Sequence, residues 1–366
     1  MSRRLDLSVP DFNSRDQMPD AEKYIRESVR ELCTYAGAPD KIEGLTEKLI
    51  NSYRAHFGLV FGQPTQYTES GRILTPAIGE IVVKPESQLI GIDNFNEAQE
   101  HLKTGNVLLI QNHTSIADML VLETLVRREF ADSTTDDWSY ISGGPVNDLT
   151  TLQGSSISSG FRRFTVNSTS EMDKMTEEQK KEAERENKKA MIALVRFSQE
   201  IGKLVVLYPE GTRNDGKMLR ARAKSFGIPS AMMRGNENLV VLPSYVKGAN
   251  HILPTNREYG SDEHSNELNR CVPNQASVTF GKMINILDII KFSENLTVIE
   301  TCIENGIVEQ GDLNDEKYKK LAAATIATDI MGGSIAHLNP EGEENGYYGS
   351  PSQKELMKSF FESLKS

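Results

Sequence analysis

The stretch Val107-Leu-Leu-Ile-Gln-Asn-His113-Thr-Ser-Ile-Ala-Asp118 decides the fold prediction for this chain. Val107 to Ile110 is an apolar run of strand length, and after a polar turn an apolar segment of helical length reaches Phe130. His113 is therefore expected where a buried strand ends and a helix begins. Open α/β sheets place their functional residues at such strand ends.

Asp118 is expected next to the His113 ring. Ser115 suits an N-cap, and Asp118 follows three residues later, so the pair has the pattern of a capping box that opens the helix. A carboxylate beside an imidazole holds one ring N–H, fixes the tautomer and stabilises the imidazolium, which makes a general base for an alcohol. The alternative is that Asp118 only caps the helix and His113 is an ordinary strand-end histidine, because short motifs often match by chance.

Composition limits the class of protein. The chain has 366 residues, of which 38% are hydrophobic and 25% charged, as in a globular protein of two domains or one large one. The formal net charge of -11 argues against a nucleic-acid partner, although it leaves room for a local basic pocket. Cys33, Cys271 and Cys302 lack the spacing of a disulfide framework or a zinc site, so we expect a reducing compartment and no metal.

The sequence also limits where in the cell the protein is expected. No apolar run approaches the ~20 residues that span a bilayer, and the first residues lack the apolar core of a secretory signal. We expect a cytoplasmic protein with possible peripheral membrane contact. Asp6, Asp11 and Asp16 argue against a transit peptide, so a place in the plastid stroma would require one to have been removed.

Hydrophobic periodicity predicts an α/β fold with a mixed, mostly parallel sheet flanked by helices. We expect a helical N-terminal domain at residues 1–80, an α/β domain at 81–340, and a C-terminal tail with a short helix at 341–366. The expected helices are Ala21–Ala36, Ile42–Phe57, Phe95–Leu102, a largely charged one within Glu171–Glu200, Asn314–Met331 and Leu356–Leu364. The expected strands are Val107–Ile110, Ser139–Ile141, Leu204–Leu207, Leu239–Leu242 and Ala276–Phe280, and Thr65–Gly91 is predicted as loop with a short strand at Ile81–Val83.

A second polar motif, Glu210-Gly211-Thr212-Arg213, follows a buried strand just as His113 does. The two segments would lie at the same edge of the sheet if their strands are parallel. Arg213 offers a planar fork of donors that suits a phosphate monoester, and Glu210 could accept hydrogen bonds from substrate hydroxyls or hold Arg213 in place. Alternatively, the motif is an ordinary strand-to-turn connection with a surface ion pair.

Arginines also occur in Gly160-Phe-Arg162-Arg163-Phe164. The glycine allows the backbone to approach a ligand closely, and two adjacent arginines could present at least one cation to it. A solvent-exposed basic pair is the competing interpretation.

A local basic run, Lys217, Arg220, Arg222 and Lys224, stands out in this acidic protein. It could receive the phosphates of coenzyme A or the acidic face of an acyl carrier protein, with Lys217 and Arg220 as the predicted donor-binding residues. A solvated loop is the simpler interpretation.

In this order, four segments resemble the four blocks of the glycerolipid acyltransferase family. They are Asn112-His113-x4-Asp118, Gly160–Phe164, Tyr208–Arg213 and Val241–Pro243. Within the family the chain is most similar to the soluble, plastid-type glycerol-3-phosphate acyltransferases, over about Asn94 to Leu338. Glu210-Gly-Thr-Arg213 and Asn112-His-x-Ser instead resemble the branch that acylates lysophosphatidate, so the acceptor stays open between the two.

The resemblance implies a mechanism for the α/β domain. His113, oriented by Asp118, would take the proton from the sn-1 hydroxyl of glycerol 3-phosphate while that oxygen attacks the thioester of acyl-CoA or acyl-ACP. No metal, no covalent enzyme intermediate and no cofactor besides this thioester co-substrate would be needed. The acceptor phosphate would be bound, and the substrate positioned, by Arg213 with Arg162 or Arg163, and by Glu210, Gly211 and Thr212.

The implied activity is the first step of phospholipid synthesis, and lysophosphatidate is the alternative acceptor. A non-catalytic lipid-binding module with the same fold is a second class of function, against which the presence of both His113 and Asp118 argues. A hydrolase is a third, but the sequence has no G-x-S-x-G nucleophile elbow.

Overall fold

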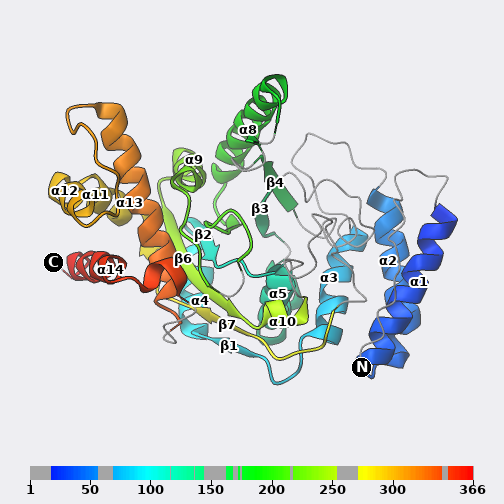
Figure 1. Ribbon diagram of the computed structural model, residues 1–366. Coiled ribbons are helices and arrows are strands. Elements are labelled where there is room, and N and C mark those ends of the chain that lie inside the picture. Colours follow the sequence, from blue (N-terminus) through cyan, green and yellow to red (C-terminus); the bar gives the residue numbers. More distant parts are fainter. Residues whose placement is uncertain are drawn as a thin grey trace.

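A mixed sheet of eight strands, counted within the described residues, forms the centre of the protein (Figure 1). The computed structural model describes residues 18–56, 69–115, 117–135, 137–143, 162–167, 172–173, 175–214, 217–253, 271–339 and 345–365. The strands are β1 (Gln88–Ile90), β2 (Asn106–Gln111), β3 (Ser139–Gly143), β4 (Arg162–Val166), β5 (Leu204–Leu207), β6 (Leu239–Lys247), β7 (Ser277–Phe280) and β8 (Ile284–Asn285). Their order across the sheet is β1-β7-β6-β2-β5-β3-β4, and β8 pairs with β6.

Most neighbouring strands run parallel. β2 pairs in parallel with β5 and β6, β3 pairs in parallel with β5 and β4, and β1 with β7. Among the described strands, β6 pairs antiparallel with β7 and with β8. The predicted fold class, α/β with a mixed, mostly parallel sheet, is confirmed.

Helices cover both faces of the sheet (Figure 1). The first face packs against α3 (Glu69–Val82), α4 (Ile92–His101), α5 (Ala117–Glu129) and α10 (Ala249–Ile252). The second packs against α8 (Glu177–Ser198), α9 (Gly227–Gly235), α11 (Ile286–Glu294), α12 (Leu296–Glu304), α13 (Glu316–Ala336) and α14 (Pro351–Ser363). None of the described helices is long and apolar enough to cross a membrane.

The apolar run of β2 has a simple explanation. Val107 and Leu109 join the core on the first face, whereas Leu108 and Ile110 join the core on the second. A strand buried on both faces carries a continuous apolar run instead of an alternating pattern, because each face needs apolar side chains.

The N-terminal region is helical, as predicted. α1 (Met18–Tyr35) and α2 (Ile42–His56) correspond to the two helices expected from apolar spacing. Their buried side chains, such as Val29 and Leu49, belong to the same hydrophobic cluster as the first face of the sheet. The predicted division into domains at residues 80 and 340 stays a prediction.

The prediction of loop and a short strand for Thr65–Gly91 is wrong over the residues of α3. Ile81 and Val82 lie in this helix, and Val83 makes only an isolated bridge to Asn274. β-branched residues favoured a strand locally, but tertiary packing decides. A Cβ on Gly79 would lie 1.8 Å from the hydroxyl oxygen of Thr124, so glycine lets α3 approach α5 closely.

Helix α13 continues beyond the expected end at Met331. Gly332-Gly333 was expected to end or bend this helix, but the helix continues to Ala336. A Cβ on Gly332 would lie 2.0 Å from the Tyr348 hydroxyl, and one on Gly333 would lie 2.3 Å from the Met357 sulfur. These glycines are therefore places of close packing rather than a helix stop. The predicted tail helix is present as α14.

Candidate active site

The ends of β2 and β5 meet at one edge of the sheet. Ile110 pairs with Leu207, so His113 and Glu210 follow these two strands at the same level. The His113 N–H donates to Glu210 Oε1 at 2.9 Å, and the Asn214 N–H donates to the His113 carbonyl at 2.7 Å. The two loops are thus hydrogen-bonded to each other, and they lie at the same edge of the sheet, as predicted for parallel strands.

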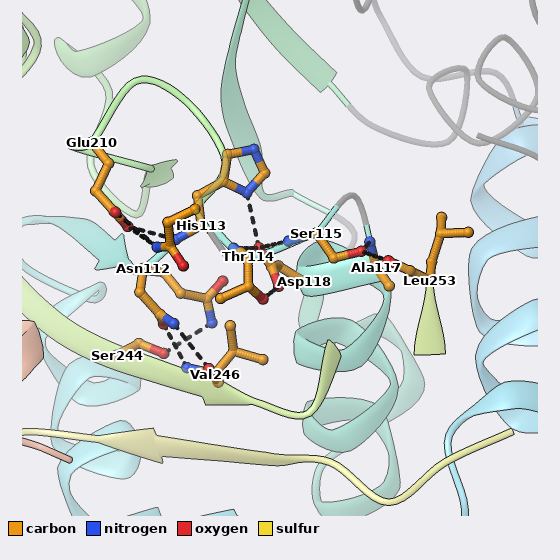
Figure 2. Close-up of polar contacts among 12 residues, drawn as sticks. Asn112, His113, Thr114, Ser115, Ala117, Asp118, Glu210, Ser244, Val246 and Leu253 are labelled. Carbon is orange, nitrogen blue, oxygen red and sulfur yellow. Dashed lines mark hydrogen bonds and ion pairs between the residues drawn. The ribbon is translucent and has the colours of Figure 1, made fainter. Parts of the chain in front are cut away.

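His113 and Asp118 form a close pair. The Nδ1 of His113 lies 2.8 Å from Asp118 Oδ2, and Figure 2 shows the ring directed at this carboxylate. The Asp118 side chain is 0% exposed, whereas that of His113 is 21% exposed. With Nδ1–H donating to Asp118, Nε2 is the nitrogen left to accept a proton from another molecule.

Four donors fix the Asp118 carboxylate. Besides His113 Nδ1, Oδ2 accepts from the N–H groups of Thr114 and Ser115 at 2.7 and 3.0 Å, and Oδ1 accepts from the Thr114 hydroxyl at 2.8 Å. Asp118 therefore reaches back to Ser115 as in the predicted capping box. The Ser115 hydroxyl itself accepts from Ala117 N–H and donates to the Leu253 carbonyl, which anchors the turn on the segment after β6.

A tyrosine supports the histidine from its face. The ring of Tyr208, the residue after β5, stacks on the His113 ring with a centroid distance of 4.3 Å and an interplanar angle of 27°. Burial raises the pKa of the Tyr208 phenol well above its ordinary value, and its hydroxyl has no hydrogen-bond partner among the described residues. Tyr208 has no role in the mechanism predicted from the sequence. Its place at a strand end before Pro209 was the only signal.

Glu210 is a buried link between three backbone segments. Its carboxylate accepts from the N–H of His113, from the N–H of Leu219 at 2.6 Å and from the side-chain amide of Asn214 at 2.8 and 3.0 Å. Burial raises its pKa to about 7, while these donors act in the opposite direction. Glu210 is 1% exposed. Glu210 thus positions the backbone of His113, and its predicted contact with substrate hydroxyls or with Arg213 stays a prediction.

The rest of the motif forms a tight turn beside His113. Gly211 has a φ of +67°, a conformation that favours glycine, and its N–H donates to the Tyr208 carbonyl at 3.0 Å. Thr212 and Arg213 are half-buried. Arg213 directly precedes Asn214, whose N–H donates to the His113 carbonyl, so the structure places this arginine next to the His113 segment.

Asn112 extends the pairing of β2 and β6 beyond the end of β2. Its side chain donates to the Val246 carbonyl at 2.9 Å and accepts from the Val246 N–H at 2.7 Å (Figure 2). A buried amide that satisfies both groups of one backbone residue fixes the chain just before His113.

The two predicted arginines of the second block lie on β4 with different surroundings. Arg163 pairs in register with Tyr140 and is 2% exposed, so it lies on the sheet face that α5 covers. Burial lowers the pKa of its guanidinium to about 10. Arg162 lies 5.6 Å from the ring centroid of Phe197, a residue of α8 on the other face. Gly160 and Phe161 lie outside the described residues.

Of the two predicted donor-binding residues, Arg220 makes an ion pair within the protein. Its guanidinium is 2.8 Å from the buried Asp329 of α13 and also donates to the Ile307 carbonyl. Burial raises the pKa of Asp329, and the bonds from Arg220 act against this rise. Arg220 thus ties the loop after β5 to the C-terminal helices, and its predicted contact with the donor stays a prediction. Lys217 is exposed, and its donor contact stays a prediction.

Comparison with known families gives a match over the segment that carries these residues. A model of the family described as Acyltransferase matches residues 93–247, from α4 to the end of β6. No curated protein matches the chain significantly. Within the described residues, no group of three or more His, Cys, Asp or Glu side chains could hold a metal ion.

Proposed function

Residues 93–247 are a domain of the acyltransferase family, and from this premise we propose that the protein acylates glycerol 3-phosphate. A fatty acyl group would pass from a coenzyme A or acyl carrier protein thioester to the sn-1 hydroxyl. The observation that carries the proposal is the bond between His113 Nδ1 and the buried Asp118, which leaves Nε2 on the partly exposed side of the ring.

In this mechanism His113 acts as general base and then as general acid. Nε2 takes the hydroxyl proton while the oxygen attacks the thioester carbonyl carbon, and a tetrahedral intermediate forms. As the intermediate collapses, the C–S bond breaks and the imidazolium returns the proton to the sulfur, which leaves as the free thiol. Asp118 stabilises the imidazolium between the two transfers, and Tyr208 restricts the tilt of the ring.

The acceptor phosphate needs cations on the same side of the sheet as the histidine. Arg213 lies in the turn that bonds to His113, which supports its proposed role. Of the two arginines on β4, we favour Arg163, because it shares the sheet face of α5 and Tyr140. Arg162 is directed instead at Phe197 of α8 on the opposite face.

Lysophosphatidate is the second candidate acceptor. Glu210-Gly-Thr-Arg213 supports it, because this motif resembles the lysophosphatidate-acylating branch, whereas the wider resemblance over about Asn94 to Leu338 favours glycerol 3-phosphate. Both acceptors present a hydroxyl and a phosphate monoester, so the chemistry at His113 would be the same.

A direct comparison of acceptors tests the proposal. The purified protein is incubated with radiolabelled glycerol 3-phosphate or lysophosphatidate and with acyl-CoA or acyl-ACP, and the products are separated and counted. We expect kcat/KM to be highest for glycerol 3-phosphate. A higher value for lysophosphatidate would establish the alternative, and absence of transfer to both acceptors would reject the proposed function.

A further inference from the structure

Arg222 is held against the turn that follows β5. Its N–H donates to the Pro209 carbonyl at 3.1 Å, and the Ser225 hydroxyl donates to the same carbonyl at 3.0 Å. Arg222 is also the N-cap of the short 3-10 helix Ala223–Phe226. The backbone of Arg222 is therefore bonded to the residue that precedes Glu210, and the Glu210 carboxylate accepts the N–H of His113.

The side chain of Arg222 lies over Gly211. A Cβ built on Gly211 would be 3.3 Å from Cδ, 3.5 Å from Nε and 4.0 Å from Cζ of Arg222. These distances place the arginine arm in contact range of the Gly211 turn, where a side chain at residue 211 would crowd it slightly. The arm is laid along the Glu-Gly-Thr turn, at the edge of the sheet that carries His113.

The charge of Arg222 is not compensated by the described part of the chain. Its guanidinium makes no hydrogen bond or ion pair with any described residue, although the side chain is half-buried. Arg220, two residues earlier, shows the contrast, because Asp329 neutralises it. The nearest carboxylate in sequence to Gly211 is Glu210, whose two oxygens already accept from N–H groups.

We propose that Arg222 binds the phosphate group of the acceptor, an inference that rests on the proposed function. A guanidinium presents donors in a fork that fits phosphate oxygens. The phosphate of glycerol 3-phosphate is only three carbons from the reacting hydroxyl, so it has to bind close to His113. The phosphates of coenzyme A or of an acyl carrier protein's prosthetic group are separated from the thioester by the whole pantetheine arm. The position of Arg222 at the Glu-Gly-Thr turn therefore suits the acceptor better than the donor.

Arg222→Met tests this proposal, because methionine keeps an unbranched arm over Gly211 and removes the charge. Hydrogen bonds from a guanidinium to phosphate predict that the acceptor KM rises about 10- to 100-fold, whereas the donor KM stays within about twofold. Arg222→Lys should fall between the wild type and Arg222→Met. Arg234→Met is the matched control, since Arg234 is an exposed arginine of α9 outside the basic run and should leave both constants unchanged.

A rise in the donor KM alone, or equal acceptor KM values for Arg222→Met and Arg234→Met, would overturn the proposal. Calorimetric titration with inorganic phosphate tests the Arg222 site independently of whether the protein transfers acyl groups. Phosphate binding by the wild type that weakens about tenfold or more in Arg222→Met supports the site even if no acyl transfer is found. Equal phosphate binding by both proteins, or none by the wild type, rejects the site even if acyl transfer is found.

Discussion

Replacing Glu210 by glutamine should change how the stability of the protein depends on pH. Burial raises the pKa of Glu210 from 4.5 to about 7. The folded state therefore holds a proton on this group in a range where the unfolded chain has lost it. The stability contributed by protonated Glu210 is fully present below pH ~4.5 and is lost as the pH rises through about 7. The size of this loss is roughly 3 kcal/mol, since one pKa unit corresponds to about 1.4 kcal/mol.

The assay compares free energies of unfolding of the wild type and Glu210→Gln between pH 5 and pH 8. Glutamine does not titrate, so the difference between the two proteins should move in favour of the variant by roughly 3 kcal/mol over this range. At low pH the variant should be less stable by about 1–3 kcal/mol, because its amide NH2 opposes the N–H of His113 or Leu219. Glu184→Gln, at an exposed position of α8, is the control and should not change stability. A difference between wild type and Glu210→Gln that stays constant with pH would refute the reasoning.

Two further substitutions test individual contacts. Tyr208→Leu removes the ring that stacks on His113 and should lower kcat about tenfold at nearly constant KM. Tyr208→Phe keeps the ring and should keep most of the activity. Equal kcat for Tyr208→Leu and wild type would mean that the stacking does not position the histidine. Arg220→Met leaves the buried Asp329 without its cation and should lower the free energy of unfolding by about 2 kcal/mol. This loss is smaller than for a fully buried ion pair, because Arg220 is partly exposed. A raised donor KM with unchanged stability in Arg220→Met would instead support the predicted donor-binding role.

The sequence was sufficient to predict the contact between His113 and Asp118 because the two residues are close in the chain. His113 and Asp118 are five residues apart, and a strand end followed by a helix start brings them together almost independently of the rest of the fold. The parallel strands before His113 and before Glu210 could also be predicted from their apolar runs. Parallel pairing then placed both motifs at one edge of the sheet.

Other parts of the site depend on contacts that no local pattern contains. Glu210 has the residue type of a substrate ligand, but its environment is set by the path of the loop through Leu219. The partner of Arg220 is Asp329, 109 residues later in the chain, and no spacing rule connects them. The different surroundings of Arg162 and Arg163 follow from β4, a strand that was not among those predicted from the sequence.

The structure also explains why α3 was missed. Ile81-Val-Val83 has the composition of a strand, and Pro76 argues against a helix interior. The buried positions Ile78 and Val82 nevertheless lie one helical turn apart, and Gly79 lets the helix approach Thr124 of α5. Packing against α5 therefore outweighs local preference.

The most direct test of the central claim is the rate of acyl transfer from acyl-CoA to glycerol 3-phosphate by His113→Ala, at saturating concentrations of both substrates and with folding checked by circular dichroism. If His113 is the general base that Asp118 orients, kcat should fall ~10²–10⁴-fold in His113→Ala. Asp118→Asn should also lower kcat by a large part of this factor. A folded His113→Ala variant that keeps more than a tenth of the wild-type kcat would contradict the mechanism.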